Sequence, residues 1–89
     1  MQKKSHVQAK QEFINEKIIR TLSSDVKSEE LKWHWDEKDR LVTILNENDW
    51  QIQFDNELPQ PIDDCIFIPE GKWHRVIKGT GYLKILINE

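Results

Sequence analysis

The sequence predicts one small all-β domain, an antiparallel β-barrel, with an α-helix at its N-terminus. Its 89 residues suffice for a single domain. From residue 31 to residue 87, roughly six short apolar segments alternate with polar turns at regular spacing, which is typical of antiparallel barrels and sandwiches. No helical segment separates these strands, so the crossover helices that parallel strands require are not expected.

Residues 1–22 are predicted to form an N-terminal helical extension, because apolar residues recur there near helical spacing after a serine, Ser5, that can cap a helix. The positions that define the apolar stripe are Val7, Ile14, Ile18 and Leu22. This segment carries five basic and two acidic residues, so its net charge is +3, whereas the remaining residues carry −6. An acidic body argues against a nucleic-acid partner, which needs a basic face.

Residues 31–36 are predicted as the first strand, because apolar and polar residues alternate there. Its two faces are Leu31, Trp33 and Trp35 on one side and Lys32, His34 and Asp36 on the other. Residues 41–45 and 50–54 are predicted to form a hairpin around the polar turn 46–49. Two prolines exclude a central strand between residues 55 and 64. The remaining strands are expected at residues 65–68, 73–78 and 82–87.

The most informative segment is 63–74, in which two aspartates and an apolar strand precede the pattern Pro-x-Gly-x-x-His. Gly71 suits a tight turn that needs a positive φ. The segment Asp63-Asp64, Pro69, Gly71 and His74 resembles the second metal motif of the cupin superfamily. The resemblance extends over residues 31–87 and implies that residues 23–89 form a small cupin-like β-barrel of the jelly-roll type.

The first cupin motif is only partly matched, by His34-Trp35-Asp36 and then Arg40. His34 matches the first histidine of the motif, Asp36 replaces the second histidine, and Arg40 replaces a glutamate. The resemblance therefore implies a candidate metal set of His34, Asp36 and His74, which suits Fe(II) and can also bind Mn, Ni or Zn. Arg40 opposes a divalent cation unless its side chain swings outward. The candidate ligand pocket comprises His34, Arg40, Trp73 and His74.

The strand register decides whether this site exists. If the face with Trp33 and Trp35 packs inward, His34 and Asp36 point to solvent and no site forms. If the N-terminal helix or a second subunit covers the tryptophans, His34 and Asp36 enter the barrel. We favour the second arrangement.

Three functions follow as hypotheses. The preferred one is a small cupin-like binding protein with a degenerate metal site, an unidentified small-molecule or protein ligand, and no established catalysis. The alternatives are a minimal metal-dependent enzyme of the dioxygenase or isomerase type that uses His34, Asp36 and His74, and a protein-interaction module that uses the basic helix and the Trp-rich face. A homodimer is expected, because so small a barrel should pair its open strand edges.

The compartment is predicted from what the sequence lacks. No apolar run approaches the roughly 18 residues of a membrane span, and no signal-peptide core is visible at the N-terminus, so a cytoplasmic protein without membrane association is expected. Cys65 is the only cysteine, which excludes an internal disulfide and a cysteine-cluster zinc site. Its apolar strand predicts a buried thiol.

Overall fold

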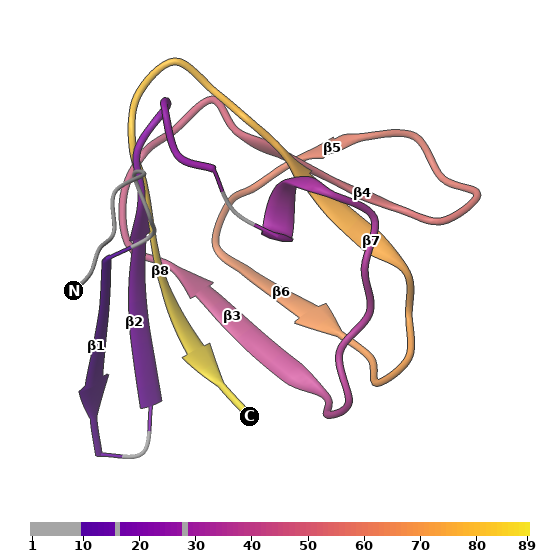
Figure 1. Cartoon of the computed structure of the whole chain (residues 1–89), viewed down its shortest axis with the longest axis horizontal. Helices are drawn as coiled ribbons and strands as arrows, with labels where there is room; N and C mark the ends of the chain where they lie inside the picture. The colour runs from indigo at the N-terminus through magenta and orange to yellow at the C-terminus, as the bar shows by residue number, and fades with distance from the viewer. Residues whose placement is uncertain (1–9, 16, 28) are drawn as a thin grey trace, which may run out of the picture.

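The computed structural model describes residues 10–15, 17–27 and 29–89 (Figure 1). Two antiparallel sheets make up the fold: a five-stranded sheet in the order β1-β2-β8-β3-β6 and a three-stranded sheet in the order β5-β4-β7. The strands are β1 Lys10–Ile14, β2 Lys17–Leu22, β3 Arg40–Ile44, β4 Gln51–Phe54, β5 Gln60–Pro61, β6 Cys65–Ile68, β7 His74–Ile77 and β8 Leu83–Asn88. The all-β antiparallel prediction is confirmed.

The predicted N-terminal helix is wrong for residues 10–14 and 17–22, which form the paired strands β1 and β2. Asn15 turns the chain with a φ of 50°, a left-handed conformation that asparagine tolerates better than most residues. β2 also pairs with β8, so this segment belongs to the five-stranded sheet. Its β-branched residues suit a strand, and pairing with β8 overrides the helical spacing. The predicted cap at Ser5 and residue Val7 lie outside the described residues.

The core lies between the inward faces of the two sheets, as β8 illustrates. Leu83, Ile85 and Ile87 are buried, whereas Lys84 and Asn88 are exposed, because alternate residues of a strand face opposite sides of its sheet. Other strands and the segments that connect them add further buried apolar side chains: Leu22, Val26, Val42, Trp50, Ile52, Phe54, Ile62 and Ile68. The Trp50 indole N–H donates to the carbonyl of Gly81 at 2.9 Å, which satisfies its buried polar atom.

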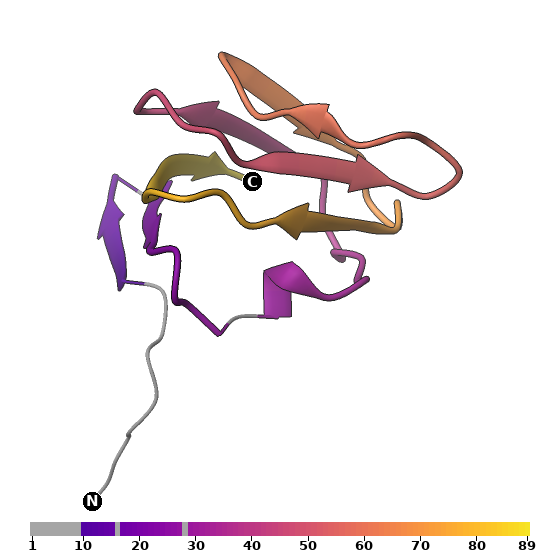
Figure 2. The same cartoon turned by 90° about the horizontal axis from the view of Figure 1, so that it is seen from above.

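Two predictions on the central part of the chain are wrong. β3 and β4 do not form a hairpin, because β3 belongs to the five-stranded sheet and β4 to the three-stranded one. Residues 31–36 do not form a regular strand: the 3-10 helix η1, Glu29–Leu31, precedes an isolated antiparallel bridge between His34 and His74. Figure 2 shows η1 outside the two sheets on one side of the molecule, where its Leu31 packs against the core.

The structure also bears on the predictions for the proline segment, for Cys65 and for membrane spans. β5 pairs only with β4 at the edge of its sheet, where a proline is tolerated. The Cys65 thiol was expected in the core, but the residue is exposed, because its register position on β6 faces away from the opposite sheet. Among the described residues, no helix has the length and apolar character needed to cross a membrane.

Candidate metal centre

The backbone joins the two candidate motifs through His34 and His74. Each residue donates its backbone N–H to the carbonyl of the other, at 3.0 and 2.9 Å. The Gly71 N–H also donates to the carbonyl of Asp36 at 2.9 Å. Gly71 has a φ of 77°, which confirms the predicted glycine turn and explains why a residue with a Cβ would be strained there. These contacts fix the positions of His34, Asp36 and His74 relative to one another.

Both histidine rings are oriented by their own backbone. Nδ1 of His34 lies 2.7 Å from the carbonyl oxygen of Lys32, and Nδ1 of His74 lies 2.8 Å from that of Lys72. A carbonyl oxygen only accepts, so each Nδ1 carries the proton and donates it. In a neutral imidazole the other nitrogen, Nε2, then has a free lone pair, which is the arrangement that metal-binding histidines use. The ring centroids are 4.3 Å apart.

Asp36 completes the set with a carboxylate oxygen that lacks a hydrogen bond. Among the residues that the structure describes, Oδ2 of Asp36 is buried without a hydrogen-bond partner, and it lies 3.5 Å from Nε2 of His74. The potential ligand atoms of His34, Asp36 and His74 all lie within 4.8 Å of one another. A buried acceptor facing lone pairs is unfavourable unless something positive joins them. This cluster is therefore positioned to hold a metal ion, and its donor set of two nitrogens and one oxygen fits one.

Burial and the neighbouring charges favour the neutral form of the His74 imidazole. Burial is the main cause that lowers the pKa of the His74 imidazole, and the nearby His34 and Arg40 act in the same direction. Hydrogen bonding to the Lys72 carbonyl and the charge of Asp36 oppose the shift only in part. A lowered pKa means that His74 is neutral at pH 7, the form in which imidazole binds metals.

Arg40 lies at the start of β3 and its side chain stays close to the site. Its Nε donates to Oε2 of Glu89 at 2.7 Å, and its Nη1 lies 3.5 Å from Oδ1 of Asp36. The side chain is only 20% exposed, so the outward swing considered from the sequence does not occur. Two carboxylates face one guanidinium, so the formal charge of Asp36, Arg40 and Glu89 together is −1. Glu89 therefore offsets much of the repulsion that Arg40 would exert on a cation.

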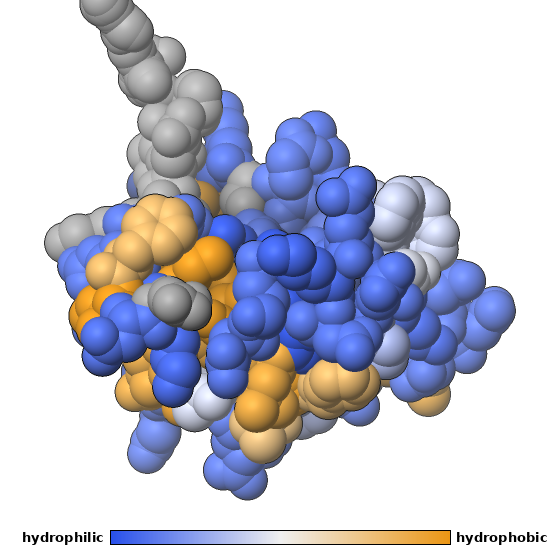
Figure 3. Space-filling view, turned by 90° about the horizontal axis from the view of Figure 1, so that it is seen from below, coloured by the Kyte–Doolittle hydropathy of each residue, from blue (hydrophilic) through white to orange (hydrophobic). Residues whose placement is uncertain are grey.

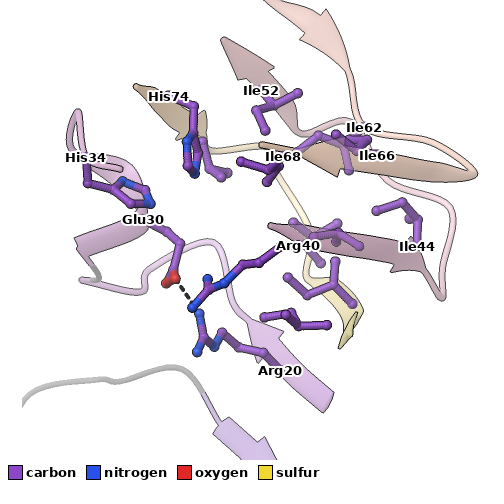
Figure 4. Close-up of a pocket in the computed structure, with 15 residues that line it drawn as sticks. Arg20, Glu30, His34, Arg40, Ile44, Ile52, Ile62, Ile66, Ile68 and His74 are labelled. Atoms are coloured by element: carbon purple, nitrogen blue, oxygen red, sulfur yellow. Dashed lines mark hydrogen bonds and ion pairs between the residues drawn. The ribbon is translucent and has the colours of Figure 1, made fainter. Parts of the chain in front are cut away.

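A cavity of about 50 Å³ adjoins the cluster. Figure 4 shows His34 and His74 on one side of it, the labelled isoleucines on the other, and the side chains of Arg40 and Arg20 beside Glu30. Arg20 is paired with Glu30 of η1. The isoleucines of the lining are Ile44, Ile52, Ile62, Ile66, Ile68, Ile85 and Ile87. A cavity that binds benzene measures roughly 150 Å³, so this space suits an ion with a few water-sized ligands.

The structure brings His34, Arg40 and His74 to one cavity but places Trp73 elsewhere. Trp73 is 46% exposed and borders a surface depression with Trp33 and Asp55. His34 and Asp36 point inward as expected, yet within the described residues no helix covers Trp33, which stays 42% exposed. Sequence reasoning missed Arg20 and Glu30. Arg20 lay in the segment mistaken for a helix, and no spacing signal linked it to Glu30.

The fold agrees with solved structures, although the sequence matches no protein-family model and no curated protein. A cupin superfamily protein from Desulfitobacterium hafniense is 20% identical, with a TM-score of 0.63 and coverage of 96% of this chain and 79% of that one. A cupin-2 domain containing protein from Shewanella frigidimarina is 22% identical, with a TM-score of 0.59 and coverage of 94% and 80%. A protein from Neisseria meningitidis is 15% identical, with a TM-score of 0.58 and coverage of 94% and 84%. At these identities the likeness establishes architecture, and the chain has the cupin fold.

Proposed function

We propose that the protein is a small cupin that binds a divalent transition-metal ion through His34, Asp36 and His74. The observation that carries this proposal is the buried Oδ2 of Asp36, which accepts no hydrogen bond from any described residue and faces the lone-pair nitrogen of His74. Both histidines donate Nδ1–H to backbone carbonyls, so their Nε2 atoms are left for a metal. A purely structural cluster would be expected to pair these atoms with one another.

The donor set indicates which ions to consider. Two imidazoles and one carboxylate suit Fe(II), Mn, Ni and Zn, whereas Mg and Ca prefer oxygen ligands alone. Three protein ligands leave coordination positions open, and a bound ion would supply Lewis-acid chemistry there. The chain's own contribution is to orient the imidazoles through the Lys32 and Lys72 carbonyls and to line the remaining space with apolar side chains.

The size of the cavity favours binding over catalysis on a large substrate. About 50 Å³ next to His34 and His74 leaves room for a ligand of only a few atoms. A sugar or an aromatic acid is too large to enter this space. The alternative of a minimal metal-dependent enzyme is therefore restricted to very small substrates, and we place it second.

The proposal is tested by loading metal-free protein with Zn(II), Mn(II), Ni(II) or anaerobic Fe(II) and measuring bound metal and thermal stability. At a free concentration of 100 times the dissociation constant, binding should stabilise the fold by about 2.7 kcal/mol. Asp36→Asn should abolish both effects. Glu37→Gln is the matched control, because Glu37 is the neighbouring carboxylate but is exposed. Less than about a tenth of an equivalent of every metal in the wild-type protein would end this proposal.

The same protein is also proposed to form a homodimer through the outer face of the five-stranded sheet. Leu41 of β3 and Phe67 of β6 are cross-strand partners on that face and are 41% and 55% exposed. Figure 3 shows hydrophobic side chains gathered on the side of the molecule where β1 and β2 lie. Phe67→Glu should shift the mass measured by light scattering from dimer to monomer. A wild-type monomer at all concentrations would contradict the dimer.

A further inference from the structure

The bridge that turns His34 and His74 inward also turns their neighbours outward. In an antiparallel pair, residues flanking the bridged pair lie opposite one another, so Trp33 lies opposite Arg75 and Trp35 opposite Trp73. β4 continues the same two rows, because Gln53 pairs with Arg75 and the Asp55 N–H donates to the Trp73 carbonyl at 3.0 Å. One outer face therefore carries six side chains, which we name the tryptophan platform: Trp33, Trp35, Trp73, Gln53, Asp55 and Arg75.

The exposure of these tryptophans requires an explanation. Trp33, Trp35 and Trp73 are 42%, 48% and 46% exposed, whereas Trp50 is buried in the core. Three large aromatic side chains on one outer face contribute little to the core, and exposed apolar surface of this kind marks binding sites. Trp33, Trp73 and Asp55 border a shallow depression of about 350 Å³, which is near the lower end of the range for small-molecule sites.

Polar groups on the platform are held in place beside the rings. The Arg75 guanidinium lies 5.1 Å from the ring centre of Trp33, and its Nε donates to Oε1 of Gln53 at 3.0 Å. Within the described part of the chain, the carboxylate of Asp55 has no hydrogen bond or ion pair of its own. The platform therefore offers oriented donors from Arg75 and free acceptor oxygens from Asp55.

The charges select the kind of ligand. Asp55 and Arg75 have opposite signs, and the nearby Lys72 and Glu57 pair with each other at 3.7 Å, so the surroundings are formally neutral. A cation would be attracted by Asp55 and repelled by Arg75. An anion would be attracted by Arg75 and repelled by Asp55. A neutral ring with hydroxyl groups satisfies both, since each hydroxyl donates and accepts while the C–H face of the ring packs on an indole.

We propose that the tryptophan platform binds a neutral hexopyranose unit of a glycan, with the sugar ring stacked on Trp73 and Trp33 and its hydroxyls bonded to Asp55 and Arg75. This site is on the outer face of the three-stranded sheet and does not depend on the metal centre. One sugar ring on a shallow surface should bind weakly, with a dissociation constant of about 1–10 mM.

The test follows the indole N–H signals by NMR, because the four tryptophans report separately. The probes are methyl β-D-glucopyranoside, methyl β-D-galactopyranoside and methyl α-D-mannopyranoside, titrated to about 50 mM, a fivefold excess over a 10 mM dissociation constant. At least one glycoside should shift the Trp33 and Trp73 signals in a saturable way. Trp50 is the internal control and should not shift, because its N–H is bonded to Gly81 in the core. Glycerol, which has hydroxyls but no ring, should produce no saturable change.

Variants separate binding from folding. Trp73→Ala and Asp55→Asn should each weaken glycoside binding about tenfold or more, a factor that corresponds to 1.4 kcal/mol. An unchanged Trp50 signal would show that each variant is folded. Leu58→Ala is the matched control, because Leu58 is 86% exposed and lies outside the platform. It should bind the glycoside as the wild-type protein does.

Three results would overturn the proposal. The first is the absence of a saturable shift with every glycoside in a folded protein. The second is a shift with choline but with no glycoside, which would assign the platform to cations. The third is broadening of the Trp33 and Trp73 signals that depends on protein concentration alone, which would make the platform an interface between copies of the chain.

Discussion

Replacing Asp36 with asparagine is expected to stabilise the metal-free protein while removing its metal site. In the described part of the chain the wild-type Oδ2 is a buried acceptor without a hydrogen bond, and such a group costs about 1–3 kcal/mol. An asparagine can place its amide NH2 at this position, 3.5 Å from Nε2 of His74, and donate to the lone pair there. The amide oxygen would remain on the side of Arg40.

For Asp36→Asn, the interactions gained should add more to the free energy of unfolding than the lost ion pair removes. A new hydrogen bond contributes about 0.5–1.5 kcal/mol, in addition to relief of the unpaired oxygen. The variant loses the attraction between Asp36 and Arg40, whose closest atoms are 3.5 Å apart and partly accessible to solvent, so this costs about 1 kcal/mol or less. The net result is a stabilisation of roughly 0.5–3.5 kcal/mol, and each 1 kcal/mol corresponds to an increase in Tm of about 4–8 °C for a domain of this size.

The assay is thermal and urea unfolding of wild-type, Asp36→Asn and Glu37→Gln proteins in the presence of a chelator. Glu37→Gln should change stability by less than about 0.5 kcal/mol, as expected of an exposed position. Adding Zn(II) should raise the Tm of the wild-type protein and of Glu37→Gln but not that of Asp36→Asn. A metal-free Asp36→Asn protein that is less stable than the wild type by 1 kcal/mol or more would refute the reasoning, because the carboxylate would then be a satisfied structural group.

Further perturbations test other parts of the structure. Arg40→Gln should raise metal affinity about tenfold, as measured by chelator competition, because it removes a positive charge and leaves the negative charges of Asp36 and Glu89 near the metal ligands. A weaker affinity would show that Arg40 orients the site. Gly79→Ala should lower the free energy of unfolding, measured in urea, by about 1–3 kcal/mol, because a Cβ at this position would lie 2.5 Å from the ring of Trp50. Gly81→Ala is the control and should change the free energy of unfolding by less than about 1 kcal/mol, because a Cβ there has no described atom within 4 Å. The Asp49 carboxylate accepts hydrogen bonds from Thr80, which lower the pKa of Asp49 below the usual 3.8. The ionised carboxylate therefore stabilises the fold fully above pH 3.8, and this stabilisation is lost as the pH falls through the lowered pKa. Acid unfolding of Asp49→Asn should lack this contribution, and an acid transition identical to that of the wild-type protein would contradict the prediction.

The segment around Gly71 and His74 could be predicted because its signals are local. A proline, a glycine with positive φ and a histidine three residues later specify a turn and the start of a strand without reference to the rest of the chain. The structure adds what the sequence did not show, namely that the Gly71 N–H holds the carbonyl of Asp36. That contact joins residues 35 positions apart.

The errors arose where distant pairing decides the local structure. Ile14, Ile18 and Leu22 recur at helical spacing, but the inward face of β2 is set by pairing with β8, which lies more than 60 residues away in sequence. The supposed hairpin between β3 and β4 failed for the same reason. Asn46 in the intervening turn bonds the backbone of Tyr82 and Lys84, which holds the connection against the end of the chain rather than in a tight reversal.

The candidate site depended on one fact that the sequence left open, the register of the bridge between His34 and His74. A one-residue slip of residues 33–35 against β7 would turn His34 to solvent and Trp33 and Trp35 inward, while the pairing of β7 with β4 would keep His74 in place. The observed register instead gives two distinct surfaces from one stretch of backbone: a small apolar cavity with metal ligands inside, and an exposed aromatic face outside. Two hydrogen bonds of the bridge and the one from Gly71 maintain this arrangement in a segment without regular strand structure. Metal binding inside should therefore rigidify the backbone on which the tryptophan platform is built, although each site binds its own ligand.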